Sequence, residues 1–173
     1  MIFGLFFDKK YLRGRYFEQS IMGWKWVFRS MITQKLCRNN AHIPWPASTK
    51  LAIDYPEGII FDPDDLNNFQ HFGCYFANTN NGIIHIGKGT WIAPNVGIVT
   101  TNHKLSNFDE HDPPKDIRIG ERCWIGMNAV LLPGVQLGPN TVVGAGSVVT
   151  KSFIEGNCVI AGNPAKFIKN ISG

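Results

Sequence analysis

A histidine at the start of a polar segment is the side chain of this sequence best suited to acid–base chemistry. His103 lies in the segment TNHKLSNFDEHDPPKD, residues 101–116, shortly after an apolar run that ends at Val99. Imidazole has an unperturbed pKa of about 6.5, so near neutral pH it can accept or donate a proton. The alternative is a solvated loop histidine without a chemical role. Residue type and position make His103 a candidate general base.

Polar neighbours in the same segment could tune this histidine. Asn102 directly precedes it and could orient the imidazole or simply end a strand. Three further side chains, Glu110, His111 and Asp112, could polarise the imidazole or lie in solvent as ordinary loop charges.

Two amides upstream are the other candidates for polar chemistry. Asn78 and Asn80 lie in the stretch YFANTN, residues 75–80. A carboxamide suits a binding site because it donates and accepts hydrogen bonds at once. The stretch Asn80-Asn81-Gly82 also has the composition of a tight turn, so a purely local role remains open.

A six-residue repeat must position these side chains. The repeated residue is aliphatic at Ile86, Ile92 and Ile98. After an interruption, the series resumes at Ile119, Ile125, Leu131, Leu137, Val143 and Val149. Four residues after an aliphatic comes a small or β-branched side chain, at Thr90, Val96, Cys123, Ala129, Val135, Thr141 and Ser147. The residue directly after the aliphatic is often Gly, at Gly87, Gly120, Gly126, Gly138 and Gly144. We expect these glycines to let the backbone turn. Six is a multiple of the strand period, so the pattern predicts a parallel β-helix of short stacked strands.

The repeat resembles that of the hexapeptide-repeat acyltransferases, in which an aliphatic residue, a small one, two free positions and another small one recur. The resemblance runs from about Ile83 to Ile168. It implies a left-handed β-helix, a hand that composition alone does not reveal because parallel crossovers are usually right-handed. The tail AGNPAKFIKNI, residues 161–171, resembles the family's closing segment and predicts a loop and short helix. A fainter six-step series, Ile60, Leu66 and Phe72, predicts that the first coils begin near residue 58.

The chain therefore divides into a front part and an acyltransferase-like β-helix. Residues 1–50 are predicted to form a basic amphipathic helical extension and linker, and residues 51–173 the all-β domain. The segment 101–116 ends in Pro113-Pro114 and is expected to leave the stack as a loop. Residues 161–173 are expected to cap the far end.

The resemblance implies direct acetyl transfer from acetyl-CoA to a hydroxyl or amine, with His103 as general base and no metal. The chain resembles galactoside and maltose acetyltransferases and acetyltransferases of polysaccharide synthesis, so the implied acceptor is a sugar. In such enzymes an Asn faces the histidine from a neighbouring subunit of a homotrimer, which corresponds here to Asn78 or Asn80. Trp124 corresponds to a residue lining the acceptor and pantetheine cleft, or to a subunit contact. We expect Asn78 and Asn102 near the catalytic histidine, and Asn80, Trp124 and Glu110 near the acceptor.

The resemblance also places the acetyl-CoA contacts on the later coils. The corresponding residues are Gly126, Met127, Ala145, Thr150, Lys151, Lys166 and Lys169. Backbone at the small residues could approach the pantetheine arm, and the lysines would meet phosphates as point charges.

Two other classes stay open at this stage. A non-catalytic binding or scaffold β-helix would keep the repeat without needing His103. A γ-type carbonic anhydrase needs three histidines around zinc, and the corresponding stretch Ile125-Gly126-Met127-Asn128 contains none.

The charge distribution is uneven. Residues 1–50 hold nine Lys and Arg against two acids, a net charge of +7, whereas residues 51–173 hold eight bases and eleven acids, a net charge of −3. The front aromatics Trp24, Trp26 and Phe28, with Lys25 and Arg29, could rest on an anionic membrane surface or pack on the β-helix as a lid. No nucleic-acid motif is recognised. Four scattered cysteines and the lack of an apolar run of roughly 18 residues predict a cytoplasmic protein, peripheral at the inner membrane face if the front binds lipid.

Overall fold

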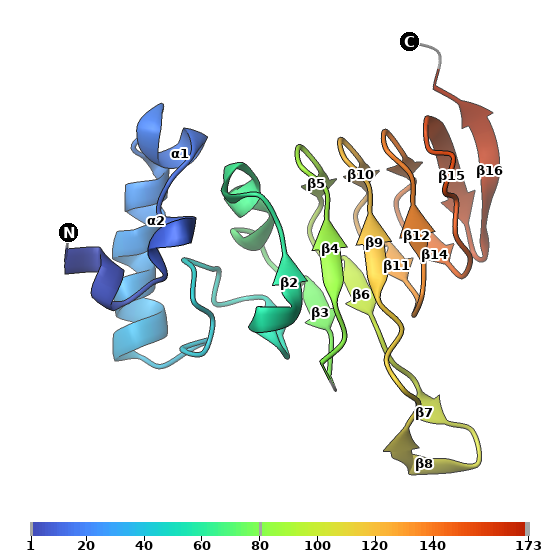
Figure 1. The fold of residues 1–173 in the computed structure, drawn as a ribbon, viewed down its shortest axis with the longest axis horizontal. Helices are drawn as coiled ribbons and strands as arrows, with labels where there is room; N and C mark the ends of the chain where they lie inside the picture. The colour runs from blue at the N-terminus through green and yellow to red at the C-terminus, as the bar shows by residue number, and fades with distance from the viewer. Residues whose placement is uncertain (1, 80, 172–173) are drawn as a thin grey trace.

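A computed structural model describes residues 2–79 and 81–171, and in it the chain forms a parallel β-helix with helices at its N-terminal end (Figure 1). Sheet A has the order β1 (Ala52–Ile53), β3 (Tyr75–Ala77), β6 (Gly97–Val99), β11 (Val130–Leu131), β14 (Val148–Val149). Sheet B has the order β12 (Gln136–Leu137), β9 (Ile117–Ile119), β4 (Ile84–Ile86), β2 (Ile59–Ile60). Sheet C has the order β16 (Ala165–Asn170), β15 (Cys158–Gly162), β13 (Val142–Val143), β10 (Trp124–Ile125), β5 (Trp91–Ile92). The chain visits sheets B, C and A in turn, so each circuit is one coil.

The predicted six-residue series forms the core of this β-helix, and the parallel β-helix is confirmed. All nine aliphatics of the series are buried, none more than 3% exposed. The small residues four positions later are buried as well. Because parallel pairing aligns equivalent residues of successive coils, Ile92, Ile125 and Val143 stack in one column inside sheet C.

The glycines after the aliphatics have a different role from the predicted one. Gly120 has no left-handed φ, but a Cβ there would lie 2.6 Å from the backbone nitrogen of Pro139 in the next coil. These glycines therefore permit close stacking of coils. The turn itself occurs three residues after the inward aliphatic, where Asn95, Asn128 and Asn140 have φ of 60°, 59° and 55°. Asn tolerates this left-handed region better than most residues, which explains its recurrence at the corners.

The C-terminal prediction of a short helix is wrong. Strands β15 and β16 instead form an antiparallel pair that extends sheet C, with Ala161 opposite Lys166. Backbone hydrogen bonds of the last coil are thereby satisfied by a returning strand. The faint front series is also out of register, because Ile60 and Phe72 are each 49% exposed while Leu66 is fully buried.

A hairpin interrupts the β-helix between β6 and β9. Its strands are β7 (His103–Lys104) and β8 (Asn107–His111), which pair antiparallel. Figure 1 shows this hairpin projecting away from the stack of coils. It leaves at the corner between sheets A and B, which we call the A–B corner.

The N-terminal segment closes the open end of the β-helix. Its helices are α1 (Arg15–Glu18) and α2 (Met22–Ser30), and α2 continues as a π-helix over Met31–Leu36. Short 3-10 helices span Ile2–Leu5, Lys9–Tyr11, Pro56–Gly58 and Pro63–Phe69. Trp45 is fully buried, with ring centroids 4.9 Å from Tyr11 and 5.1 Å from both Phe61 and Phe69. This aromatic cluster covers the first coils.

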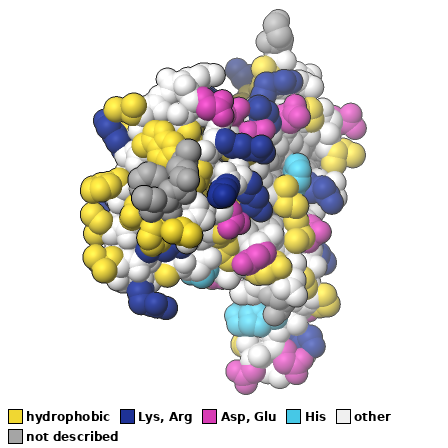
Figure 2. All heavy atoms as spheres, turned by 60° about the vertical axis from the view of Figure 1, so that its left-hand side comes forward, with side chains coloured by type: hydrophobic (Ala, Val, Ile, Leu, Met, Phe, Trp, Pro, Cys, Tyr) yellow, Lys and Arg dark blue, Asp and Glu magenta, His cyan; other side chains and the backbone are white. Residues whose placement is uncertain are grey.

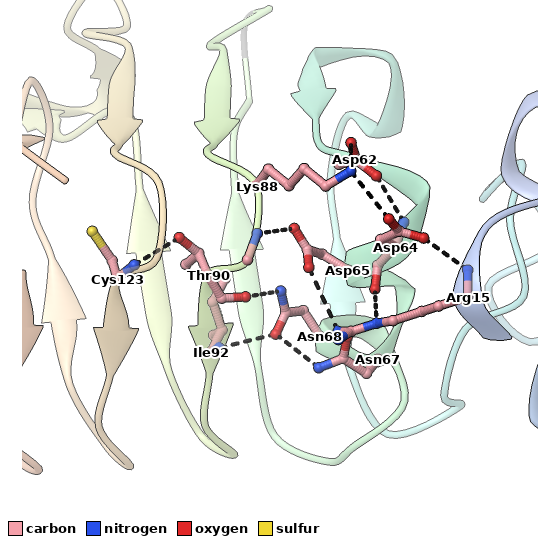
Figure 3. A network of polar contacts seen from close by, with 11 residues as sticks. Arg15, Asp62, Asp64, Asp65, Asn67, Asn68, Lys88, Thr90, Ile92 and Cys123 are labelled. Carbon is pink, nitrogen blue, oxygen red and sulfur yellow. Dashed lines mark hydrogen bonds and ion pairs between the residues drawn. The ribbon is translucent and has the colours of Figure 1, made fainter. Parts of the chain in front are cut away.

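A polar network joins the N-terminal segment to the β-helix (Figure 3). The backbone amide of Arg15 donates to the Asp64 carboxylate at 2.7 Å, and the Arg15 guanidinium donates to the Asp64 backbone oxygen at 2.7 Å. The buried Asp65 carboxylate accepts from the Gly89 amide at 2.8 Å and lies 3.7 Å from the Arg15 guanidinium. Burial raises the pKa of Asp65 to about 6, and the Gly89 and Arg15 contacts only partly offset this rise.

We expect Asp65 to make the stability of the fold depend on pH between about 4 and 6. In this range the folded state holds a proton on Asp65 that the unfolded chain, with its lower pKa, has released. Stability from this group is therefore greatest below pH 4, and falls by up to about 3 kcal/mol as pH rises through 6. Asp65→Asn keeps an oxygen for the Gly89 amide and should remove this dependence, measured as the wild-type-minus-variant difference in unfolding free energy across pH. Asp109→Asn, an exposed carboxylate on the hairpin, is the control; a flat difference for Asp65→Asn would contradict the expectation.

Candidate active site

The hairpin fixes the tautomer of His103. Its Nδ1 lies 2.6 Å from the backbone oxygen of Phe108, across the hairpin. A carbonyl oxygen can only accept, so Nδ1 carries the hydrogen in the neutral ring, and Nε2 keeps its lone pair. The side chain is exposed, so Nε2 can reach a molecule bound against the hairpin. This is the arrangement that a general base requires.

A second imidazole lies against the first. His103 is paired with His111 in the β7–β8 hairpin, and their ring centroids are 4.2 Å apart with planes inclined by 36°. Of the three titratable residues that the sequence placed near His103, His111 is therefore the one whose ring packs on it. The alternation of side chains along β8 places His111 beside the base and turns Glu110 away.

Glu110 is engaged elsewhere, which corrects its expected place at the acceptor. Its carboxylate accepts from the Lys104 ammonium and, at 3.1 Å, from the Asn107 amide. These hydrogen bonds, the one from Lys104 foremost, lower the pKa of Glu110. Glu110 thus braces the hairpin.

Asn78 is also corrected, from a catalytic candidate to a structural residue. Its side chain is fully buried, and its amide donates to the backbone oxygens of Tyr55 at 2.6 Å and Gly82 at 3.2 Å. Its oxygen accepts from the Tyr55 amide at 3.0 Å, and the buried side chain is out of reach of an acceptor substrate. Asn80 lies outside the described residues. Asn102 is exposed beside His103, and its backbone oxygen accepts from the Asp112 amide at the base of the hairpin.

The expected acetyl-CoA contacts fall at two different corners of the β-helix. Thr150 and Lys151 follow β14 at the A–B corner, on the same edge of the β-helix as the hairpin. Gly126, Met127 and Ala145 lie at the turns from sheet C to sheet A, which we call the C–A corner. Met127 and Ala145 are exposed there. Sheet A separates the two corners, so one copy of the chain does not bring all these residues together.

The remaining expected contacts lie on sheet C. Lys166 and Lys169 are exposed on its edge strand β16. Trp124 is 55% exposed on the outer face and is in register with Trp91, which is 53% exposed. Sequence reasoning singled out Trp124 but missed Trp91, although the six-step repeat places both at the position before an inward Ile.

A groove of about 630 Å³ lies along the outer face of sheet B, away from these residues. Its lining includes His85, Arg118 and Gln136, which are in register on successive strands. None of the expected site residues lines it. The groove therefore does not enclose His103 or the expected acetyl-CoA contacts.

Comparison with known proteins shows what the coils resemble. Residues 116–151 match the family model described as bacterial transferase hexapeptide (six repeats). The coils in this part of the chain are therefore similar to transferase hexapeptide repeats. The chain is 39% identical over 131 residues to the putative lipopolysaccharide biosynthesis O-acetyl transferase WbbJ of Escherichia coli, covering 66% of this chain and 62% of that protein. It is 33% identical over 136 residues to the galactoside O-acetyltransferase of Lactococcus lactis, covering 71% of this chain and 65% of that protein.

A solved acetyltransferase structure has a similar fold. A galactoside acetyltransferase in complex with coenzyme A superposes with a TM-score of 0.58 at 31% identity, covering 74% of this chain and 62% of that one. This chain thus spans less than two thirds of the length of these relatives.

The described residues contain neither a candidate metal site nor a membrane-spanning helix. Within residues 2–79 and 81–171, no three His, Cys, Asp or Glu side chains gather closely enough to hold a metal ion. In the same part of the chain, each helix is too short or too polar to span a bilayer.

Proposed function

We propose that this protein is an acetyltransferase that uses His103 as general base to acetylate a hydroxyl or amine with acetyl-CoA. The observation that carries the proposal is the hydrogen bond between Nδ1 of His103 and the Phe108 oxygen, which leaves Nε2 as a free acceptor on an exposed hairpin. The similarity to O-acetyltransferases and to a coenzyme A complex supports the choice of co-substrate.

The proposed reaction needs only one proton carrier. Nε2 of His103 takes the proton of the acceptor as its oxygen or nitrogen attacks the thioester carbonyl. The tetrahedral intermediate collapses as its carbon–sulfur bond breaks, and the imidazolium returns a proton to the departing thiolate. Since a thioester is already activated, neither a covalent enzyme intermediate nor a metal is required.

The site is proposed to form between copies of the chain. His103, Thr150 and Lys151 lie at the A–B corner, whereas Gly126, Met127 and Ala145 lie at the C–A corner. A homotrimer of left-handed β-helices places the A–B corner of one copy against the C–A corner of the next, so both sets face one cleft. Trp124 would line that cleft, and Lys166 and Lys169 would meet the phosphates of acetyl-CoA.

The acceptor is proposed to be a sugar hydroxyl of a saccharide or polysaccharide precursor in the cytoplasm. The test is thiol release from acetyl-CoA, measured against mono- and disaccharides, amino sugars and chloramphenicol. Acceptor-dependent release is expected for at least one saccharide. Release with chloramphenicol alone would contradict the saccharide acceptor, and release with amino sugars alone would contradict the hydroxyl in favour of an amine. Absence of both release and acetyl-CoA binding would overturn the enzyme in favour of a non-catalytic β-helix.

A further inference from the structure

The helix at the N-terminal end carries its most apolar side chains on its exposed face. The residues that α2 and its π-helical continuation bury are small or polar for the most part: Gly23, Val27, Ser30 and Gln34. Four of the exposed side chains are large and apolar: Ile21 at the N-cap, Phe28, Ile32 and Leu36, with exposed fractions of 68%, 67%, 47% and 77%. This distribution reverses that of an ordinary surface helix, whose apolar stripe faces the core. We call these four residues the apolar ridge.

Hydrogen bonds on the buried face hold the helix in this orientation. The Ser30 hydroxyl donates to the Ala47 backbone oxygen at 3.2 Å. The Gln34 side chain donates to the Trp45 oxygen at 3.2 Å and accepts from the Ala47 amide at 2.9 Å. Turning the ridge inward would leave these buried groups without partners, which is costly. The ridge therefore stays exposed in a single copy of the chain.

The N-terminal segment that carries the ridge has an excess of positive charge. Lys25 lies within the ridge, between Ile21 and Phe28, and is exposed. Residues 1–50 carry a net charge of +7, and further exposed bases are Lys9, Lys10, Arg13 and Arg38. Figure 2 turns this end toward the viewer and shows hydrophobic side chains gathered on it, with Lys and Arg at the border of the patch.

The side chains that the sequence suggested for a membrane surface lie in two different environments. Phe28 and Lys25 are exposed. Trp26 packs on the Tyr16 ring, 4.7 Å between centroids, and against the core. Arg29 donates to the Gln70 side chain at 2.7 Å and so anchors α2 to the β-helix. Exposed side chains and side chains packed on the rest of the chain therefore lie on different faces of one helix.

We propose that the apolar ridge rests on the surface of an anionic lipid bilayer. Apolar side chains flanked by lysine and arginine fit the boundary between acyl chains and negative headgroups, where both kinds of side chain find a partner. A second copy of the chain fits less well, since a two-fold contact through the ridge would bring Lys25 and the neighbouring bases of both copies together. This proposal does not depend on the acetyltransferase activity.

Sedimentation with vesicles tests it on the full chain. Wild type should bind vesicles containing roughly 30% phosphatidylglycerol, and should be released when NaCl is raised from about 0.05 to 0.5 M. The triple variant Phe28→Ser, Ile32→Ser, Leu36→Ser should lower the partition coefficient at least about tenfold, because exposed positions lose apolar contact without loss of core packing. Lys25→Glu should also weaken binding to anionic vesicles.

Leu105→Ser is the matched control, since Leu105 is 93% exposed at the tip of the hairpin, far from the ridge in the sequence. It should bind vesicles like wild type. Equal binding by wild type and the folded triple variant would overturn the proposal. A second result would also overturn it: wild type does not bind vesicles, and it forms an assembly that dissociates in the triple variant. That result would assign the ridge to a contact with a second copy of the chain.

Discussion

Replacing His103 with alanine is expected to lower kcat for acetyl transfer by about 10²–10⁴-fold, with acetyl-CoA affinity and folding nearly unchanged. The imidazole is exposed on a hairpin that leaves the stack of coils, so its loss removes the proton acceptor without opening the core. Steady-state thiol release with a saturating acceptor measures the effect. Added imidazole should restore part of the rate, which a merely structural role for His103 would not predict.

Glu110→Gln is the matched control for this hairpin. It weakens the ion pair with Lys104 but leaves the contact between Nδ1 of His103 and the Phe108 oxygen in place. We expect an activity within about twofold of wild type, because exposed ion pairs contribute little. Full activity of His103→Ala would refute the general-base role, and a loss in Glu110→Gln as large as in His103→Ala would return Glu110 to the site.

Replacing Trp45 with alanine is expected to destabilise the fold by about 3–5 kcal/mol. Trp45 is fully buried where the N-terminal segment covers the first coils, and its ring contacts those of Tyr11, Phe61 and Phe69. Its removal leaves a cavity at the point that joins the front of the chain to the β-helix. Denaturant unfolding should show a lower midpoint.

Two variants define the origin of that cost. Trp45→Phe keeps most of the ring and removes Nε1, a buried donor without a hydrogen-bond partner among the described residues, so we expect it to cost less than half as much. Phe72→Ala removes an aromatic ring that is 49% exposed and should cost under about 1 kcal/mol. Equal costs for Trp45→Ala and Phe72→Ala would contradict a closing role for the aromatic cluster.

The sequence predicted the coils because burial there repeats with a fixed period. Every sixth residue from Ile86 to Ile98, and again from Ile119 to Val149, faces inward, and strand pairing makes each such residue stack on its equivalent. The same reasoning failed for Ile60, because side chains alternate along a strand and a shift of one residue reverses the face. The left-handed φ of Asn95, Asn128 and Asn140 recurs at one position of the repeat. That position could have been recognised in the sequence, because it is often Asn or Gly.

The candidate site was predictable in part only. His103 stood out because it opens a polar interruption between two regular coils. The structural role of Asn78 depends on Tyr55, which lies 23 positions away and reaches it only after the coils stack. The orientation of His103 depends on the backbone oxygen of Phe108, and no side-chain pattern reveals a backbone partner.

Complementation between two inactive variants tests whether acetyl transfer takes place at a site shared by the A–B corner of one copy and the C–A corner of the next. His103→Ala removes the base at the A–B corner, and Ala145→Glu places a negative charge at the exposed C–A corner, where it should repel acetyl-CoA. When the two variants are mixed randomly within one assembly, about a quarter of the cleft sites pair an intact A–B corner with an intact C–A corner. We expect thiol release near that fraction of the wild-type rate. Release no greater than the sum of the two separate variants, in assemblies shown to be mixed, would contradict it.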